Sequence, residues 1–534
     1  MTCNSSVSTS RDHSTILAPV TLSALDYSIL IVYGLGILGM SVFLSRRQKD
    51  TRQYFIAGKS MPGWAVAMTL MAVLIGSGTV VGHPATVYQS GMILLLGNLT
   101  LVIVLLFVAR YIVPFYRRTV GMSAYEYIGK RFGLGGRFYA SFGFLADRLF
   151  DLGLTLLTTA IALNVMTGWP LPSVIFWSSL FTVFYTMIGG ISAVVWASVV
   201  QGFIFVGAAV LIVARLLFAP EAGPFGAVVG EAWSAGKFTL GSFDLTSLGD
   251  PMLTSQWLFI LAYMVNWGRR YISDQHMVQR YLIAKSDREA SRGAIWNALL
   301  CVPIYCIFMF IGACLFGYYA LTEQPPPQLV DNVVPYFIVN NMPAGIVGLI
   351  LAAILAASMS SVSGDLNSIA TVLTRDYLNY LRPEASDRFQ LIFGRLMVVV
   401  AGIVTMLIAI LLIPEQGLAS VMERAVTIAA ILSGGMLGLF FLGFLTRRAT
   451  RTGCYIGIIS CLLFTGWALL TEPKNNILDL PLNFGLNPII IGVLSHIVLF
   501  GVGYAASLIF GGYRPEEVEQ LTIYGKASGE RSAA

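Results

Sequence analysis

Long apolar runs recur along the whole chain and constrain its fold more than any other feature of the sequence. A run of 18 or more apolar residues is long enough to cross the hydrocarbon core of a bilayer as an α-helix. Such runs dominate the 534 residues, of which 56% are hydrophobic and 11% are charged. A soluble domain carries about 25% charged residues. The sequence therefore predicts an all-α integral membrane protein.

Hydropathy predicts thirteen transmembrane spans with soft boundaries. They cover residues 23–45, 62–89, 91–113, 136–166, 171–189, 192–217, 253–278, 294–320, 343–374, 390–413, 421–444, 452–471 and 487–510. With this count, basic stretches such as "SRRQKDTR", "QRYLIAKSDREASR" and "LTRRATR" all fall on one side, and the alternate loops hold only Lys237 and Lys474. Cytoplasmic loops carry an excess of Lys and Arg. We therefore expect a multi-pass protein of the cell (plasma or inner) membrane, with its N-terminus outside and its C-terminus cytoplasmic.

Two of the predicted spans contain residues that weaken a helix. The second reads "TLMAVLIGSGTVVGHPATVYQSG", and the seventh reads "LAYMVNWGRRYISDQ" with Gly268 near its middle. Close helix packing explains any single glycine in a membrane helix. Broken helices at corresponding positions of two five-helix halves indicate instead a transporter with its site at the breaks. The halves would be residues 62–217 and 253–444, inverted in the membrane.

The stretch "AASMSSVSGDLNS", residues 356–368, places hydroxyls on successive turns of a predicted membrane helix. Ser360, Ser361 and Ser363 form a polar arc, because successive helical residues are about 100° apart. Each hydroxyl could bond a carbonyl of its own helix, or the serines could be small residues at a helix interface. A third interpretation is a cation site, in which hydroxyls and the carbonyls freed at a broken helix supply the oxygen ligands.

Six motifs follow one another in order: "RQYFIAGKSMPGWA", "SAYEYIGKRFG", "YTMIGGISAVVWASVVQG", "SDQHMVQRYLIAKS", "MPAGIVGLILAAILAASMSSVSGDLNSIATVLTRD" and "LGFLTRRATRTGCYIGI". From about residue 23 to 470 the chain resembles the sodium:solute symporter family, which includes sodium-coupled sugar, proline, pantothenate, monocarboxylate and sialic acid carriers. The resemblance implies a LeuT-type 5+5 inverted repeat. The chain would then comprise an extracellular polar tail (1–22), a leading helix (23–45), the two repeats (62–217 and 253–444), two trailing helices (452–510) and a cytoplasmic tail (511–534).

The resemblance also implies a function. We expect a secondary active transporter, not an enzyme, that takes up a small polar organic solute together with Na⁺ by alternating access. The expected partners are the solute and the lipid bilayer, with no nucleic acid and a monomeric functional unit. Two alternatives are a transporter-like solute sensor and an intramembrane enzyme. The sequence shows no nucleophile–base pair or metal-ligand spacing for the enzyme.

A Na⁺ site of five uncharged oxygens follows from matching the family's motifs residue by residue. Its ligands would be the carbonyls of Ala72, Ile75 and Ala357 and the hydroxyls of Ser360 and Ser361.

Some members have a second Na⁺ site that needs an aspartate in a "WTD" pattern and further serines. Here the pattern reads "WAS" with Ser198, and one of the later serines is Gly364. Asp365 is a nearby carboxylate that leaves a rearranged site open. These departures favour one Na⁺ per solute.

Positions that line the solute in relatives match Gly76, Thr79, Asn98, Asp151, Trp267 and Tyr271. Asn98 would bind the solute or make a helix–helix hydrogen bond. Asp151 stands where the sialic acid carriers place an arginine for the substrate's carboxylate, and charges within a membrane are costly unless they are paired or functional. It would contact the solute or bridge to Arg269 or Arg270. The identity of the solute stays open among a sugar, a zwitterionic amino acid, an amine and a carboxylate.

Overall fold

The computed structural model describes residues 22–46, 48–244, 255–413, 434–472, 478–511 and 518–525, and these are helical almost throughout. Within these ranges, strand-like pairing is limited to one isolated bridge between Met61 and Ala284. Nine of the described helices are long and apolar enough to cross a membrane, or ten if one bent pair forms a single span. The predicted all-α class is therefore confirmed, whereas the count of thirteen spans stays a prediction.

The helices that carry the fold are the following. They are α1 (Ala24–Ser45), α3 (Gly63–Leu74), α4 (His83–Ser90), α5 (Leu95–Phe107), α6 (Val113–Thr119), α8 (Leu134–Thr167), α9 (Leu171–Leu217), α11 (Gln256–Ser273), α12 (Gln275–Ile283), α13 (Asp287–Leu321), α15 (Ile346–Val372), α17 (Asp387–Leu411), α19 (Met436–Leu445), α20 (Arg451–Thr471) and α21 (Ile489–Ile509). Shorter helices are α2 (Thr51–Ile56), α7 (Tyr125–Phe132), α10 (Ala227–Ser234), α14 (Val333–Asn341) and α16 (Asn379–Leu381).

Helix α9 joins two predicted spans, 171–189 and 192–217, and is interrupted at Gly190. A straight helix of its 47 residues would be about 70 Å long, more than twice the thickness of the hydrocarbon core. Gly190 has a φ of +54°, which residues with a Cβ rarely adopt, and a Cβ there would lie 2.7 Å from the Tyr54 ring. The interruption therefore lies where the sequence places the boundary between the two spans.

The structure contains a helix break in each of the two predicted regions. The first lies where it was predicted, and the second lies at a different residue. Helices α3 and α4 are bent by 63° across the expected break in the second span. In the seventh span α11 continues through Gly268, so the predicted break there is wrong. The chain leaves helical geometry at Asp274, with φ −85° and ψ 127°. Gly268 serves packing instead, because a Cβ on it would lie 3.1 Å from Leu437. For the predicted span 421–444, residues 421–433 lie outside the described residues.

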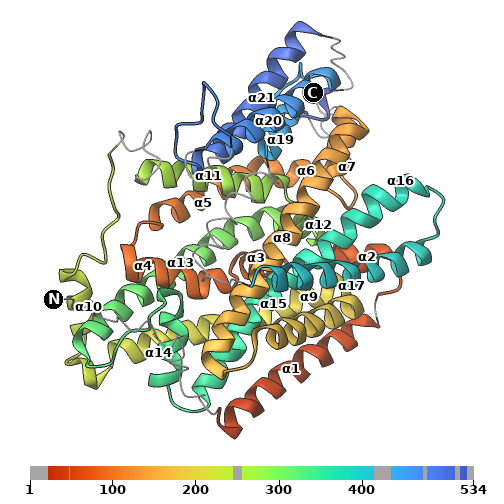
Figure 1. Cartoon of the computed structure of the whole chain (residues 1–534). Helices are drawn as coiled ribbons and strands as arrows, with labels where there is room; N and C mark the ends of the chain where they lie inside the picture. The colour runs from red at the N-terminus through yellow and green to blue at the C-terminus, as the bar shows by residue number, and fades with distance from the viewer. Residues whose placement is uncertain are drawn as a thin grey trace, which may run out of the picture.

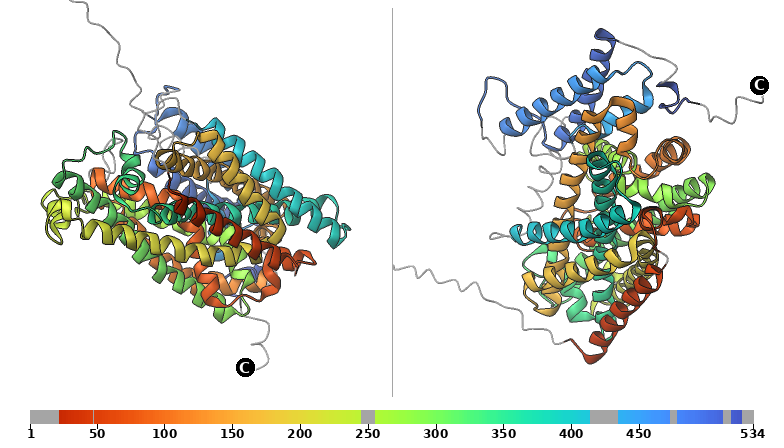
Figure 2. Two further views of the ribbon diagram at one scale, coloured as in Figure 1. Left: turned by 90° about the horizontal axis from the view of Figure 1, so that it is seen from below. Right: turned by 90° about the vertical axis from the view of Figure 1, so that its right-hand side faces the viewer.

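Helix α15 lies in the interior, and α1 lies at the edge. In the most apolar 18-residue stretch of the span that contains α15, 83% of the residues are buried. In the corresponding stretch of α1, only 11% are buried. Figures 1 and 2 show α1 at one end of the molecule and α19, α20 and α21 together at the other. Asp26 fastens α1 to the start of α15, where its carboxylate accepts the amides of Gly345 (2.8 Å) and Gly348 (2.6 Å).

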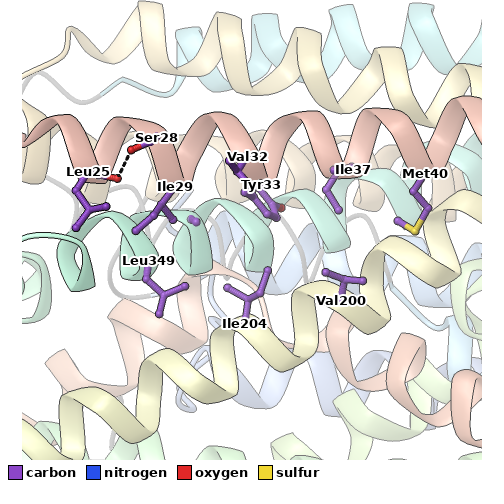
Figure 3. Close-up of a pocket in the computed structure, with 12 residues that line it drawn as sticks. Leu25, Ser28, Ile29, Val32, Tyr33, Ile37, Met40, Val200, Ile204 and Leu349 are labelled. Carbon is purple, nitrogen blue, oxygen red and sulfur yellow. Dashed lines mark hydrogen bonds between the residues drawn. The ribbon is translucent and has the colours of Figure 1, made fainter.

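An apolar groove of about 520 Å³ runs between α1, α9 and α15 (Figure 3). The side chains that line it are almost all aliphatic, and the hydroxyl of Ser28 is bonded to carbonyls of its own helix. Such a lining suits hydrocarbon and offers a polar solute few partners. Buried polar side chains lie instead in the interior, on α15.

Candidate sodium and solute sites

The break between α3 and α4 frees carbonyl groups in the interior. Helix α3 ends at Leu74, and Ile75 has the non-helical angles φ −94° and ψ 84°. A π-helical turn, Gly78–Gly82, then leads into α4. The last carbonyls of a helix have no intrahelical partner. The end of α3 therefore offers acceptor oxygens to whatever lies opposite.

The serines of α15 lie opposite this helix end. The Ser360 hydroxyl donates to the Ala72 carbonyl at 2.6 Å, and the Ser361 hydroxyl donates to the Val73 carbonyl at 2.9 Å. Both hydroxyls also approach the carbonyl of Ala357, at 3.0 and 3.3 Å. All these groups are buried. We call this set of oxygens the hydroxyl cluster.

The hydroxyl cluster contains four of the five predicted Na⁺ ligands, Ala72, Ala357, Ser360 and Ser361. The fifth, Ile75, directly precedes Gly76, on which a Cβ would lie 3.4 Å from the Ser361 hydroxyl. The cluster is uncharged and consists of hydroxyl and carbonyl oxygens, which hard cations prefer. In the structure the two hydroxyls bond the helix-end carbonyls directly, and the same oxygens are of the type that would serve as ligands to a monovalent cation. The Val73 carbonyl was not among the predicted ligands, because only the packing of α15 on α3 reveals its approach.

A second polar cluster joins α8 to α11 through ion pairs. Asp147 accepts from Arg148 at 2.7 Å and from Arg269 at 2.9 Å. Asp151 accepts from Arg148 at 2.9 Å and lies 3.6 Å from Arg270. The predicted bridge to an α11 arginine is thus formed most closely by Asp147, with Asp151 in looser contact. We call these five residues the charge network.

Asp365 connects the two clusters, because it lies one helical turn after Ser361 on α15. Its carboxylate is 3.7 Å from the Arg148 guanidinium and 3.5 Å from Nδ1 of His276. It therefore faces the charge network. Ser363, which points its hydroxyl at the carbonyl of Ser360 (3.3 Å), is two residues and about 200° away around the helix.

The glycine at position 364 has a packing cause. A Cβ on Gly364 would lie 2.3 Å from Nη2 of Arg280, a fully buried side chain on α12. The guanidinium is held by the Thr69 hydroxyl at 3.2 Å and by the carbonyl of His276. Arg280 thus occupies the space that a side chain at 364 would need. Sequence reasoning missed this contact, since nothing local links the two positions.

Gly76 and Thr79 lie at the α3–α4 break, as predicted, and Thr79 is buried there. Asn98 on α5 donates to the carbonyl of Leu94 in its own helix at 3.0 Å and lies 3.4 Å from His83. Its amide oxygen is buried without a hydrogen-bond partner among the described residues.

Trp267 and Tyr271 pack against α13. The Trp267 ring lies 6.1 Å from that of Tyr305, and the fully buried Tyr271 hydroxyl is bonded to Asn297. Aromatic contact and hydrogen bonding to α13 give both side chains structural partners. None of the cavities described for the structure is lined by all six predicted solute residues, although His83 and Tyr305 link Asn98 to Trp267.

A polar cavity of about 410 Å³ opens beside the charge network. Its described lining comes from α8, α11 and the ends of α20 and α21. Of the six predicted solute residues, Asp151 alone is in that lining. The lining also includes Tyr263, Asn266 and Arg270. Sequence reasoning did not select Tyr263 or Asn266, although both lie within one or two helical turns of the "GRRY" arginines.

Comparison with known proteins agrees with these features. The model of the sodium:solute symporter family matches residues 54–461. The chain is 29% identical to the sodium/sialic acid symporter NanT of Aliivibrio fischeri, over 94% of this chain and 97% of the relative. It is 32% identical to the sodium/sialic acid symporter SiaT of Proteus mirabilis, over 82% and 87%. A solved Na⁺-coupled sialic acid symporter, substrate-bound and outward-open, superposes with a TM-score of 0.83 at 29% identity, covering 92% of this chain and 99% of that one.

The family match spans well over half of the chain, which therefore belongs to the sodium:solute symporter family. It is a Na⁺-coupled symporter of the LeuT-type fold that works by alternating access. The predictions of family, fold class and coupling ion are confirmed.

Proposed function

We propose that the chain takes up a small polar organic solute across the cell membrane, driven by Na⁺ that binds at the hydroxyl cluster. The observation that carries this proposal is the meeting of Ser360 and Ser361 with the carbonyls at the end of α3. Na⁺ bound there, with Ile75 as a further ligand, would hold α15 against α3. A cation bound between two helices that move apart during transport links its occupancy to their separation.

The proposed orientation has the N-terminus outside and the C-terminus in the cytoplasm, with residues 62–217 and 253–444 as the inverted repeats. One Na⁺ per solute and a monomeric functional unit complete the proposal. Arg280 fills the space beside Gly364, which supports a single Na⁺ site. We expect no enzymatic activity.

Two relatives transport sialic acid, and their substrate is a candidate for this chain. The resemblance implies an arginine for its carboxylate where this chain has Asp151. Of the three arginines in the cavity lining, Arg270 on α11 has the most exposed side chain. A sialic acid held in the manner of the relatives is therefore not the expected solute.

Uptake into proteoliposomes tests the proposal. An inward Na⁺ gradient should drive accumulation of labelled solute, and replacing Na⁺ by choline should abolish it. The neutral oxygens of the hydroxyl cluster provide no group for proton coupling at neutral pH. Uptake that persisted in choline but collapsed with a protonophore would therefore overturn the proposal.

A further inference from the structure

The charge network presents one anion and one cation to the cavity. Asp151 has 33% of its side-chain surface exposed and Arg270 has 21%. The other three members are covered, at 3% for Asp147, 2% for Arg148 and 8% for Arg269. Of the charge network, a solute in the cavity would therefore meet mainly the carboxylate of Asp151 and the guanidinium of Arg270. The lining also includes Glu472 and His496, which are 2% and 8% exposed.

The two exposed groups are adjacent without being fully engaged with each other. Asp151 and Arg270 are 3.6 Å apart, which is longer than a hydrogen bond. Nε of Arg270 is buried and has no hydrogen-bond partner among the described residues. A buried donor without a partner costs free energy, so the protein pairs this guanidinium incompletely. Nε itself is covered, and a solute would meet the exposed part of the Arg270 side chain.

Arg269, the neighbour of Arg270 in sequence, is in contrast paired by carboxylates of the protein. It donates to Asp147 at 2.9 Å and lies 3.5 Å from Asp274, both on the protein side. One arginine of the "GRRY" motif is thus engaged by the protein, and the other keeps donors for the cavity. Asp151 is likewise held in place by Arg148 while its carboxylate remains exposed.

We infer that Asp151 and Arg270 select a zwitterion, a solute with an ammonium group and a carboxylate on the same or neighbouring carbons. This inference rests on the proposed uptake function and assigns its substrate class. The carboxylate of the solute accepts from Arg270, which suits planar acceptors, and the ammonium group donates to Asp151. α-Amino acids have this arrangement.

The other solute classes fit the pair less well. A simple carboxylate that bound Arg270 would lie next to the like charge of Asp151, and a simple amine that bound Asp151 would lie next to Arg270. Like charges at such distances repel. A neutral sugar would cover two charges without neutralising either. A zwitterion pairs both and leaves the net charge of the cavity unchanged.

Uptake by the full chain in proteoliposomes tests this inference. The common L-amino acids are supplied one at a time as labelled probes, with N-acetylneuraminate, glucose and lactate in parallel. We expect Na⁺-driven uptake of at least one amino acid, and much weaker competition from its matched amine and its matched desamino acid. Na⁺-driven uptake of N-acetylneuraminate, glucose or lactate alone overturns the inference and leaves Na⁺-coupled uptake standing. Absence of Na⁺-driven flux for every probe counts against both.

Two variants separate recognition from folding. Asp151→Asn and Arg270→Gln should each raise the KM for the amino acid by about 30-fold or more, as expected when one member of a charge pair is removed. Their selectivities should move in opposite directions, with Asp151→Asn favouring the desamino acid and Arg270→Gln favouring the amine. This ratio does not depend on how much protein folds. Gly207→Ala, at an exposed glycine of α9 with nothing within 4 Å, is the control. Unchanged selectivity in both variants overturns the inference.

Discussion

The hydroxyl cluster and the charge network both place polar groups deep in the helix bundle, but they stabilise them differently. The hydroxyl cluster uses neutral oxygens that bond one another, so no full charge is desolvated. The charge network places three cations against two anions, and Asp147 alone accepts from two arginines. The first arrangement tolerates the arrival of one cation, because no fixed charge competes with it. In the second, an added charged group meets fixed charges of both signs. The comparison explains how one interior could serve both a cation and a solute.

Removing the centre of the charge network should have the largest effect on stability. Asp147→Asn leaves Arg148 and Arg269 short of their shared partner, and breaking a buried ion pair costs about 3–5 kcal/mol. We expect a large loss of folded protein, measured as the monodisperse yield and Tm of the detergent-purified full chain.

Adding Arg269→Gln to Asp147→Asn should recover much of that loss, because the uncompensated cation is removed with its partner. If Asp147→Asn kept the yield and Tm of the wild type, the charge network would not be the stabilising unit described above.

The next largest loss of stability should come from crowding the contact between α12 and α15. Gly364→Ala introduces a Cβ 2.3 Å from Arg280, and overpacking of a core costs about 1–3 kcal/mol. We expect a lower Tm and weaker transport. Gly207→Ala is the control, since its Cβ meets no atom within 4 Å. Equal Tm values for the two variants would show that Arg280 moves away freely.

Neutralising the link between the two clusters should have a smaller effect on stability and a specific effect on coupling. Asp365→Asn keeps the size of the side chain and removes the charge that lies 3.7 Å from Arg148. The Na⁺ concentration for half-maximal uptake should then depend less on solute concentration than in the wild type, by a factor of a few. Ser363→Ala removes a hydroxyl that bonds the carbonyl of Ser360 and not the charge network, and should leave that dependence unchanged. An undiminished dependence in Asp365→Asn would show that the two clusters communicate by another route.

The smallest effect on stability is expected for Asp151→Asn, because Arg148 keeps Asp147 as a partner. Its yield and Tm should stay close to those of the wild type while solute affinity falls. A variant with normal solute affinity and reduced yield would reverse this assignment and make Asp151 purely structural.

The sequence predicted the fold where signals were local and strong. Apolar runs predicted the long membrane-type helices, and three closely spaced glycines with a proline predicted the bend between α3 and α4. The second break was placed at Gly268 and lies at Asp274, because a glycine can equally serve packing against Leu437. Asp is a favoured N-cap residue, yet a single Asp is a weak signal in sequence.

The sites were predictable to different extents for a related reason. The Na⁺ ligands were predicted one by one from the family resemblance. Four of the five predicted ligands meet in the hydroxyl cluster. The contact of Arg280 with Gly364 depends on how α12 packs on α15, which no local pattern encodes. Trp267 and Tyr271 have the residue types of a solute wall, and the structure shows that both also contact α13; their role in binding solute stays a prediction.

The most direct test of the account is whether Na⁺ binds at Ser360 and Ser361. The measurement is the Tm of the detergent-purified full chain as NaCl replaces choline chloride at constant ionic strength, for the wild type, Ser361→Ala and Ser363→Ala. A ligand that binds only the folded state adds RT ln(1 + [L]/Kd) to its stability, so Tm begins to rise near the Kd and climbs logarithmically above it. We predict such a rise in the wild type and in Ser363→Ala, and an onset at a Na⁺ concentration at least about tenfold higher in Ser361→Ala, the equivalent of losing one ligand worth about 1.4 kcal/mol. The same onset concentration in all three proteins would contradict binding at Ser361.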